Sequence, residues 1–142
     1  MKNCDTKYCE CMYYSANALA RVMTKIADEE FSNIGVSASY AFLLMIVNEN
    51  PGINPKKIGN IMQLAPSTIT RLIEKMEFKG YLIRDQNWRS TKVFPKQASL
   101  DLDKKIRRSW ENLNLRYTSI LGTKEAEQLT SKMHIASQIL SN

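Results

Sequence analysis

Two helix-start signals, close together in the middle of the 142-residue chain, constrain its fold more than any other feature. Asn54-Pro55 is an N-cap followed by proline at the first helical position, where the missing amide hydrogen costs nothing. Pro66 marks a second start, and Gly80 supplies a left-handed C-cap for the helix that begins there. Because the first of these helices ends near Met62, only three or four residues separate the two. We therefore predict a helix-turn-helix motif.

A two-stranded hairpin is predicted directly after this motif. Tyr81–Ile83 and Thr91–Phe94 are short segments rich in β-forming residues. They bracket a polar tip over Asp85–Ser90. Pro95 fits only the end of such a strand, so the hairpin should stop there. Helix-turn-helix followed by hairpin is the order of a winged helix.

Longer helices are expected on both sides of this unit, because apolar residues recur three and four apart. The first runs from about Tyr8 to Phe31, and the next, Ala38–Asn48, has an apolar middle that indicates burial on most sides. Ser37 is its expected N-cap. A long helix begins near Gln97, and after a break a last helix covers about Thr123–Leu140.

Length and composition fit one domain, since 142 residues with 44% hydrophobic content supply a single core. We expect a mainly α fold in which helices in 1–36 and 97–142 flank a winged helix-turn-helix at 37–96. The longest apolar run, Tyr40–Val47, is far shorter than a membrane span, and no export signal appears near Met1. The sequence therefore predicts a cytoplasmic protein with no membrane partner.

The net charge of +6 is concentrated in one block, Asn54–Lys96, which holds nine basic and three acidic residues. Such a block indicates a polyanionic partner, although a charged run is also typical of a plain solvated face. In a winged helix, the second helix of the motif meets base edges in the major groove, and the hairpin tip reaches the backbone or the minor groove. The predicted partner is double-stranded DNA.

Within Pro66–Arg71 we expect Ile69 to face inward and the hydroxyl and guanidinium groups to face outward. Hydroxyls bond phosphates or bases, and arginine bonds guanine O6 and N7 in bidentate fashion. The candidate DNA-binding residues are Lys56, Lys57, Ser67, Thr68, Thr70, Arg71, Lys75, Arg84, Arg89 and Lys92.

The segment from Ala65 to Asp85 resembles the recognition helix and first wing strand of the MarR family. The order of helices before and after the winged unit resembles that family as well. The resemblance implies a homodimeric regulator, acting as a repressor, whose outer helices form the dimer interface. It also implies release from the DNA operator by a small ligand or by thiol oxidation.

Some positions depart from the family's wing. Asn87 stands where the family commonly has an acidic residue two positions before an arginine, so we expect Arg89 to be less tightly braced. The segment Phe94–Ala98 lacks the leucine and glycine that usually close the wing. Two alternatives stay open for Trp88, packing on the wing or touching a sugar, and for Arg84, contacting phosphate or pairing with its neighbour.

The resemblance further implies a small aromatic or anionic ligand between the DNA-binding unit and the dimer helices. Its candidate pocket residues are aromatic, although aromatic side chains at helical spacing also serve as plain core. They are Tyr13, Tyr14, Tyr40, Trp110 and Tyr117.

The three cysteines, Cys4, Cys9 and Cys11, allow three interpretations, and a cytoplasmic setting argues against a disulfide framework. They are incidental thiols, or Cys9 and Cys11 act in redox sensing, or the cluster binds metal together with His134. The segment beginning at Cys9 resembles the region where the organic-peroxide-sensing branch of the family has its reactive cysteine. Tyr40 likewise falls where that branch has a tyrosine. C-x-C lacks the usual C-x-x-C spacing of a zinc site, so we predict no metal site.

Catalysis is not expected, and neither is a cofactor. A nucleophilic cysteine needs a nearby base, but the only histidine lies 123 positions after Cys11, and no phosphate-binding glycine loop is present. The competing function is a winged-helix module without an inducer, either a non-specific DNA-binding or nucleoid protein or a protein-interaction domain.

Overall fold

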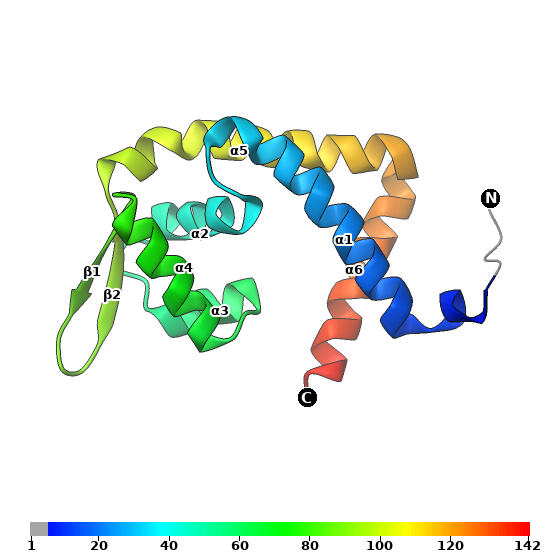
Figure 1. The fold of residues 1–142 in the computed structure, drawn as a ribbon, viewed down its shortest axis with the longest axis horizontal. Coiled ribbons are helices and arrows are strands. Elements are labelled where there is room, and N and C mark those ends of the chain that lie inside the picture. The colour runs from blue at the N-terminus through cyan, green and yellow to red at the C-terminus, as the bar shows by residue number, and fades with distance from the viewer. Residues whose placement is uncertain (1–5) are drawn as a thin grey trace.

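A computed structural model describes residues 6–142 and shows a helical protein with one small sheet (Figure 1). The elements in chain order are the 3₁₀ helix η1 (Lys7–Glu10), α1 (Met12–Phe31), the 3₁₀ helix η2 (Ser32–Ile34), α2 (Ala38–Glu49), α3 (Pro55–Met62), α4 (Pro66–Phe78), β1 (Leu82–Gln86), β2 (Thr91–Pro95), α5 (Gln97–Leu121) and α6 (Thr123–Leu140). The predicted mainly α winged helix-turn-helix with long terminal helices is confirmed.

The winged unit is built around α2, whose middle is buried on nearly all sides. Leu43, Leu44 and Val47 are fully buried there, and they belong to the same core as Ile58 of α3 and Ile69 of α4. An apolar helix without a polar face needs partners around it. Here α3, α4, β2 and α5 supply them.

Local signals fix the two short helices where the sequence predicted them. The Asn54 side chain accepts a hydrogen bond of 2.8 Å from the Lys57 backbone amide, which caps α3. A Cβ atom on Gly59 would lie 3.3 Å from the Leu64 carbonyl oxygen, so a small residue lets α3 and the turn approach closely. Gly80 has a φ of 84°, the left-handed conformation expected after α4.

The wing is an antiparallel pair that runs from Leu82 opposite Pro95 to Gln86 opposite Thr91. The first strand ends three residues later than predicted and the second one residue later, so Asp85 belongs to β1 and the tip shrinks to residues 87–90. At its base, the Val93 amide donates to the Ile53 carbonyl at 2.9 Å. This bridge ties the wing to the turn between α2 and α3.

The helix α5 forms a spine along the molecule (Figure 1). In this view the winged unit lies below one half of α5, and α1 and α6 extend downward from the other half. Arg107 of α5 pairs with Glu49 of α2 at 2.9 Å, and Arg116 pairs with Glu29 of α1 at 2.7 Å. Ala126 is the buried residue of α6.

One predicted helix start and one predicted cap are wrong in detail. The first helix begins at Met12 instead of near Tyr8, because Cys11 is extended and separates α1 from η1. Ser37 occupies the N-cap position of α2, but its side chain makes no capping hydrogen bond. The Ala38 amide donates instead to Asp28 of α1 at 3.1 Å, a partner that only the tertiary fold supplies.

Within residues 6–142, no single helix is long and apolar enough to cross a membrane. One bent pair, Met12–Ile34 with Ala38–Glu49, meets the length and hydropathy requirements only when both helices are taken together, across an angle of 64°. The second helix of that pair is the buried centre of the winged unit.

Candidate nucleic-acid interface

The first two turns of α4 divide into a buried and an exposed face. Ile69 and Ile73 are 0% and 1% exposed and fix the helix on the core, as predicted for Ile69. Ser67, Thr70 and Arg71 are exposed on the other side. The Thr70 hydroxyl donates to the Pro66 carbonyl at 3.0 Å, which leaves its oxygen available as an acceptor. These residues form a row of polar groups on a rigid helix, while Thr68 is half-buried.

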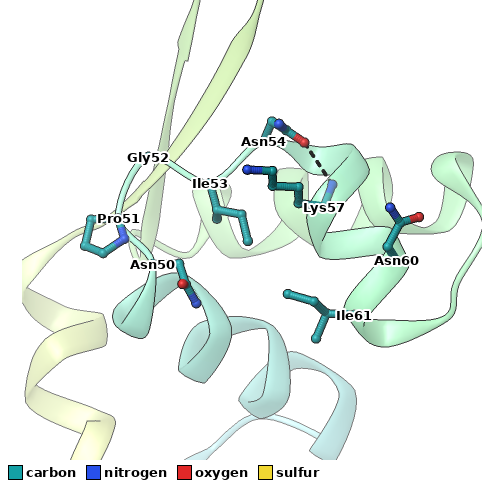
Figure 2. A pocket seen from close by; sticks show the side chains of 8 residues that line it. All are labelled: Asn50, Pro51, Gly52, Ile53, Asn54, Lys57, Asn60 and Ile61. Atoms are coloured by element: carbon teal, nitrogen blue, oxygen red, sulfur yellow. Dashed lines mark hydrogen bonds between the residues drawn. The ribbon is translucent and has the colours of Figure 1, made fainter.

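The helix α3 presents Lys56 and Lys57 to solvent beside a polar hollow of about 570 Å³. Figure 2 shows this hollow at the junction of α2, the following turn and α3. Asn50, Asn54 and Asn60 line it together with Lys57 and the apolar side chains of Ile53 and Ile61. Amide groups and an ammonium beside the start of a short helix can hold a phosphate oxygen of a polyanion.

The wing tip is ordered by one asparagine. The Asn87 side-chain oxygen accepts hydrogen bonds of 2.9 Å from the amides of Arg89 and of Ser90. This turn leaves Trp88 85% exposed, and the Arg89 guanidinium lies 4.1 Å from the centre of its ring. The sequence predicts a less tightly braced Arg89, and among the described residues its guanidinium lies against the exposed indole and pairs with no carboxylate. Trp88 does not pack into the wing.

The wing tip and α3 also face each other. A hollow of about 480 Å³ is lined by Asn54, Pro55 and Lys56 on one side and by residues 87–91 on the other. Lys56 and Arg89 therefore border the same concave surface, with no acidic residue among those that line it. A further hollow, lined by Lys56 and by Pro66 and Thr70, joins this surface to the start of α4.

Residues 36–92, which include the helix-turn-helix and most of the wing, match the family model described as MarR family. The winged unit of this chain is thus similar to that of the MarR family. Members of this family are transcriptional regulators that bind DNA and are not enzymes. The resemblance seen in the segment from Ala65 to Asp85 is thus confirmed.

Similar proteins extend the match beyond the winged unit. The uncharacterized HTH-type transcriptional regulator YybA of Bacillus subtilis (strain 168) is 25% identical over 119 residues, covering 82% of this chain and 79% of YybA. A putative MarR family regulator from Listeria monocytogenes, solved with 26mer DNA, has a TM-score of 0.75 at 22% identity and covers 99% and 90% of the two chains. CouR from Rhodococcus jostii RHA1, bound to p-coumaroyl-CoA, has a TM-score of 0.74 at 15% identity and covers 90% and 93%. The likeness to the Listeria structure, which spans 99% of this chain, includes the terminal helices.

In this MarR-type wing, Arg84 is engaged inside the protein. Its guanidinium donates to Glu77 of α4 at 2.9 and 3.1 Å, and a second carboxylate, Glu74, lies 3.9 Å away. The hydrogen bonds from Arg84 hold the pKa of the Glu77 carboxyl below its usual value. Arg84 therefore pairs with α4 and not with Asp85, and this placement argues against a direct phosphate contact.

Lys75 is also partly engaged, because its Nζ lies 5.5 Å above the centre of the Tyr40 ring of α2. Lys92 is exposed on β2, directly across the hairpin from Asp85. The remaining predicted contacts, Lys56, Lys57, Ser67, Thr70, Arg71 and Arg89, all keep exposed side chains.

The structure does not bring the five candidate pocket aromatics together within one chain. Trp110 borders a pocket between α2, α3 and α5, whereas Tyr117 borders another between α5 and α6. Tyr13 and Tyr14 lie near the start of α1 and are 79% and 47% exposed. Trp110 and Tyr117 are seven positions apart, which places them about 10 Å apart along α5, under different neighbouring helices.

The pocket beside Trp110 contains residues that the sequence analysis did not single out. Phe42 and Glu49 of α2 line it, together with Met62 and Leu64 at the end of α3. The sequence indicates part of this lining, since Phe42 and Glu49 are seven positions apart and therefore lie on the same face of α2. What the sequence could not supply is the position of α3 below that face.

The N-terminal cysteines depart from the expectation that no disulfide forms. Cys9 is disulfide-bonded, whereas Cys11 is an exposed free thiol, and Cys4 lies outside the described residues. The segment η1, which carries Cys9, lies at the opposite side of the molecule from α2, so Tyr40 is remote from it within one chain (Figure 1). In residues 6–142 no group of three or more His, Cys, Asp or Glu side chains is arranged to hold a metal ion.

Proposed function

We propose that this protein is a homodimeric, sequence-specific repressor of the MarR type that docks α4 into the major groove and the wing tip into the adjacent minor groove. The observation that carries the proposal is the division of α4. Ile69 and Ile73 hold the helix on the core, so that Ser67 and Arg71 face outward on a rigid support. The basic wing tip and α3 continue the same side of the molecule.

Each predicted contact receives a role from its placement. Arg71 reads guanine, and Ser67, Thr68 and Thr70 bond bases or phosphates near it. Lys56, Lys57 and Lys92 neutralise phosphates, and Arg89, supported by Trp88, enters the minor groove. Lys75 and Arg84 act as positioning residues, because one lies over Tyr40 and the other braces the wing on α4.

A second copy of the chain is the partner that its terminal helices require. Exposed apolar side chains on α6 include Leu129 at 38%, Met133 at 44% and Ile139 at 68%. Exposed apolar residues on one stripe of a long helix mark an association surface. An obligate dimer buries about 2,000 Å² or more, so we expect α1 to contribute to the interface beside α6.

Binding of a small ligand, or oxidation of a thiol, releases the protein from DNA. The protein acts in the cytoplasm, where the chromosome lies. The pocket beside Trp110 is the ligand site that we propose, because it lies between the winged unit and α5. The oxidation route would start from the thiol of Cys11, which is exposed two residues from the disulfide-bonded Cys9.

Two matched variants test the DNA-binding assignment on a duplex selected from a random pool and on its scrambled counterpart. Arg71→Ala should weaken binding to the selected duplex by about 1–3 kcal/mol and relax its sequence preference. Lys56→Ala should weaken binding to both duplexes alike. It should also reduce the slope of log affinity against log salt concentration by about one. Equal losses on both duplexes for Arg71→Ala would contradict a base-reading role. Absence of any selected sequence would favour the non-specific alternative.

A further inference from the structure

The pocket beside Trp110, hereafter the α5 pocket, has the size and lining of a small-molecule site. Its volume is about 510 Å³, within the range of about 300–1,000 Å³ that drug-sized ligands occupy. Phe42 and Met45 of α2 and Leu64 after α3 supply apolar walls. Of the nine residues that line it, Glu49 is the one that carries a charge.

The aromatic part of this lining is suited to a cation. The rings of Phe42 and Trp110 meet edge to face, with centroids 6.2 Å apart and an interplanar angle of 81°. Trp110 keeps 39% of its surface exposed. The face of an indole attracts ammonium groups, and aromatic walls with a nearby carboxylate are the usual means of binding quaternary ammonium ligands.

The charges beside the pocket favour the same ligand. Glu49 pairs with Arg107 at 2.9 Å, but the same guanidinium also donates to Asp103 at 2.7 Å. Two carboxylates therefore share one arginine, which leaves a net charge of −1. Burial raises the pKa of Asp103, but hydrogen bonds from Arg107 and Asn48 together outweigh it and keep this pKa below its usual value. An anionic ligand would meet no basic side chain in the lining. It could pair with the Arg107 guanidinium only by displacing Glu49.

From these observations we propose that the α5 pocket binds an organic cation that carries an aromatic group, with the ammonium at Glu49 and the ring against Trp110. The inference deepens the proposed function and rests on it for the consequence of binding. It replaces the anionic ligand expected from the family resemblance with a cationic one.

The pocket is joined to the connection between the winged unit and α5. Asp103, which shares Arg107 with Glu49, accepts a hydrogen bond of 3.0 Å from Asn48 of α2. Asn48 in turn accepts one of 2.7 Å from the Ser99 hydroxyl of α5. A cation that competes for Glu49 weakens the ion pair between α2 and α5. The winged unit can then turn on its spine, and two recognition helices no longer match half-sites about 34–36 Å apart.

Fluorescence of Trp110 provides the direct test, in a Trp88→Phe background so that one tryptophan remains. The probes share one ring: benzyltrimethylammonium, benzenesulfonate and benzyl alcohol. We expect saturable quenching by the cation, with affinity about tenfold above that for the neutral alcohol. The sulfonate should bind more weakly than either. Tighter binding of the sulfonate, or equal affinity for all three probes, would overturn the proposal.

Two variants separate the charge from the ring, each checked by circular dichroism for a native fold. Glu49→Gln should remove the tenfold preference for the cation and leave binding of benzyl alcohol unchanged. Phe42→Leu should weaken the cation and the alcohol together, which keeps the proposal testable if Glu49→Gln fails to fold. Unchanged preference for the cation in Glu49→Gln would contradict the role of the carboxylate.

A DNA-binding assay of the otherwise unaltered chain distinguishes this inference from the proposed function. Benzyltrimethylammonium should weaken binding to the selected duplex, and Glu49→Gln should lose this response. If the ligand-free protein binds no duplex, the proposed repressor function fails while the fluorescence result stands. If the protein binds DNA but its pocket does not prefer the cation, only the ligand assignment fails.

Discussion

The winged unit and the two arms, α1 and α6, use apolar residues in opposite ways. In the winged unit Leu43, Ile58 and Ile69 are fully buried within one chain. In α6 the only buried residue is Ala126, while larger apolar side chains such as Met133 remain exposed. The winged unit therefore completes its core alone, and the arms do not.

This difference shows which part of the fold depends on a partner. A helix of 18 residues, the length of α6, gains most of its stability from packing its apolar stripe. Within one chain α6 meets mainly the end of α5, with Ala126 as the point of closest packing. Substitutions in the arms should therefore change the association of two chains without unfolding the winged unit.

The largest effect is expected from charges placed on the exposed stripe of α6. The double variant Leu129→Asp with Met133→Asp should give monomers, because two carboxylates would be buried in the proposed interface. Without a linked second half-site, DNA affinity should fall by about 10²–10⁴-fold. Light scattering gives the mass, and anisotropy of a labelled duplex gives the affinity. The control, Ser131→Asp with Gln138→Asp, alters exposed polar positions of the same helix and should stay dimeric.

The complementary change lies in the core of the winged unit. Ile69→Ala should lower the free energy of unfolding by about 2–5 kcal/mol, since it leaves a cavity at a fully buried site. It should leave the dimer dissociation constant unchanged, whereas Leu129→Ala should weaken the dimer. Urea unfolding and sedimentation equilibrium measure the two quantities. A shift of the dimer constant by Ile69→Ala would show that the two regions are not separable.

The same contrast explains how much the sequence predicted. Asn54, Pro66 and Gly80 act through their own backbone neighbours, so the helices of the winged unit were predicted almost to the residue. The inward side of α4 followed from the spacing of Ile69 and Ile73. The charged block in the middle of the chain also pointed correctly to DNA as the family's partner.

Contacts between distant segments were not accessible in this way. Arg84 lies beside Asp85 in the sequence but pairs with Glu77, because the turn at Gly80 folds β1 back along α4. The cap of α2 comes from Asp28, ten residues earlier. The α5 pocket needs α3 placed below α2, which periodicity does not specify. The predicted aromatic residues Trp110 and Tyr117 border different pockets of one chain for the same reason, since spacing along α5 does not say which helix covers each turn.

Two ion pairs allow a smaller test of the difference between the winged unit and the arms. Arg84 with Glu77 attaches the wing to α4, and Arg116 with Glu29 attaches α1 to α5. The lowered pKa of Glu77, caused mainly by hydrogen bonds from Arg84, stabilises the fold when Glu77 is ionised. That stabilisation is present above the pKa of the unfolded chain and is lost as the pH falls through the lowered pKa of the folded state. Glu77→Gln should therefore cost about 1 kcal/mol or less near pH 7 and nothing at low pH.

Unfolding by urea at several pH values measures this cost. The matched control is Glu29→Gln, which removes a partner of Arg116 on α1 and should alter the attachment of the arm without affecting the wing. DNA binding, measured at concentrations where both variants are dimeric, distinguishes them, since only Glu77→Gln loosens the wing against α4. A pH-independent loss in Glu77→Gln would mean that the side chain acts through packing instead of through its charge.

The smallest effect concerns the wing tip, where Trp88 supports Arg89. Trp88→Ala should weaken DNA binding by about two- to fivefold, the value of an exposed cation–π contact, and Trp88→Phe should restore part of it. If Trp88 acts through Arg89, Trp88→Ala should have no further effect in an Arg89→Ala background, as a double-mutant cycle would show. Additive losses would instead assign Trp88 its own contact with the DNA sugar. In that case the wing would contribute two independent contacts, and the indole would not stand in for the missing carboxylate at position 87.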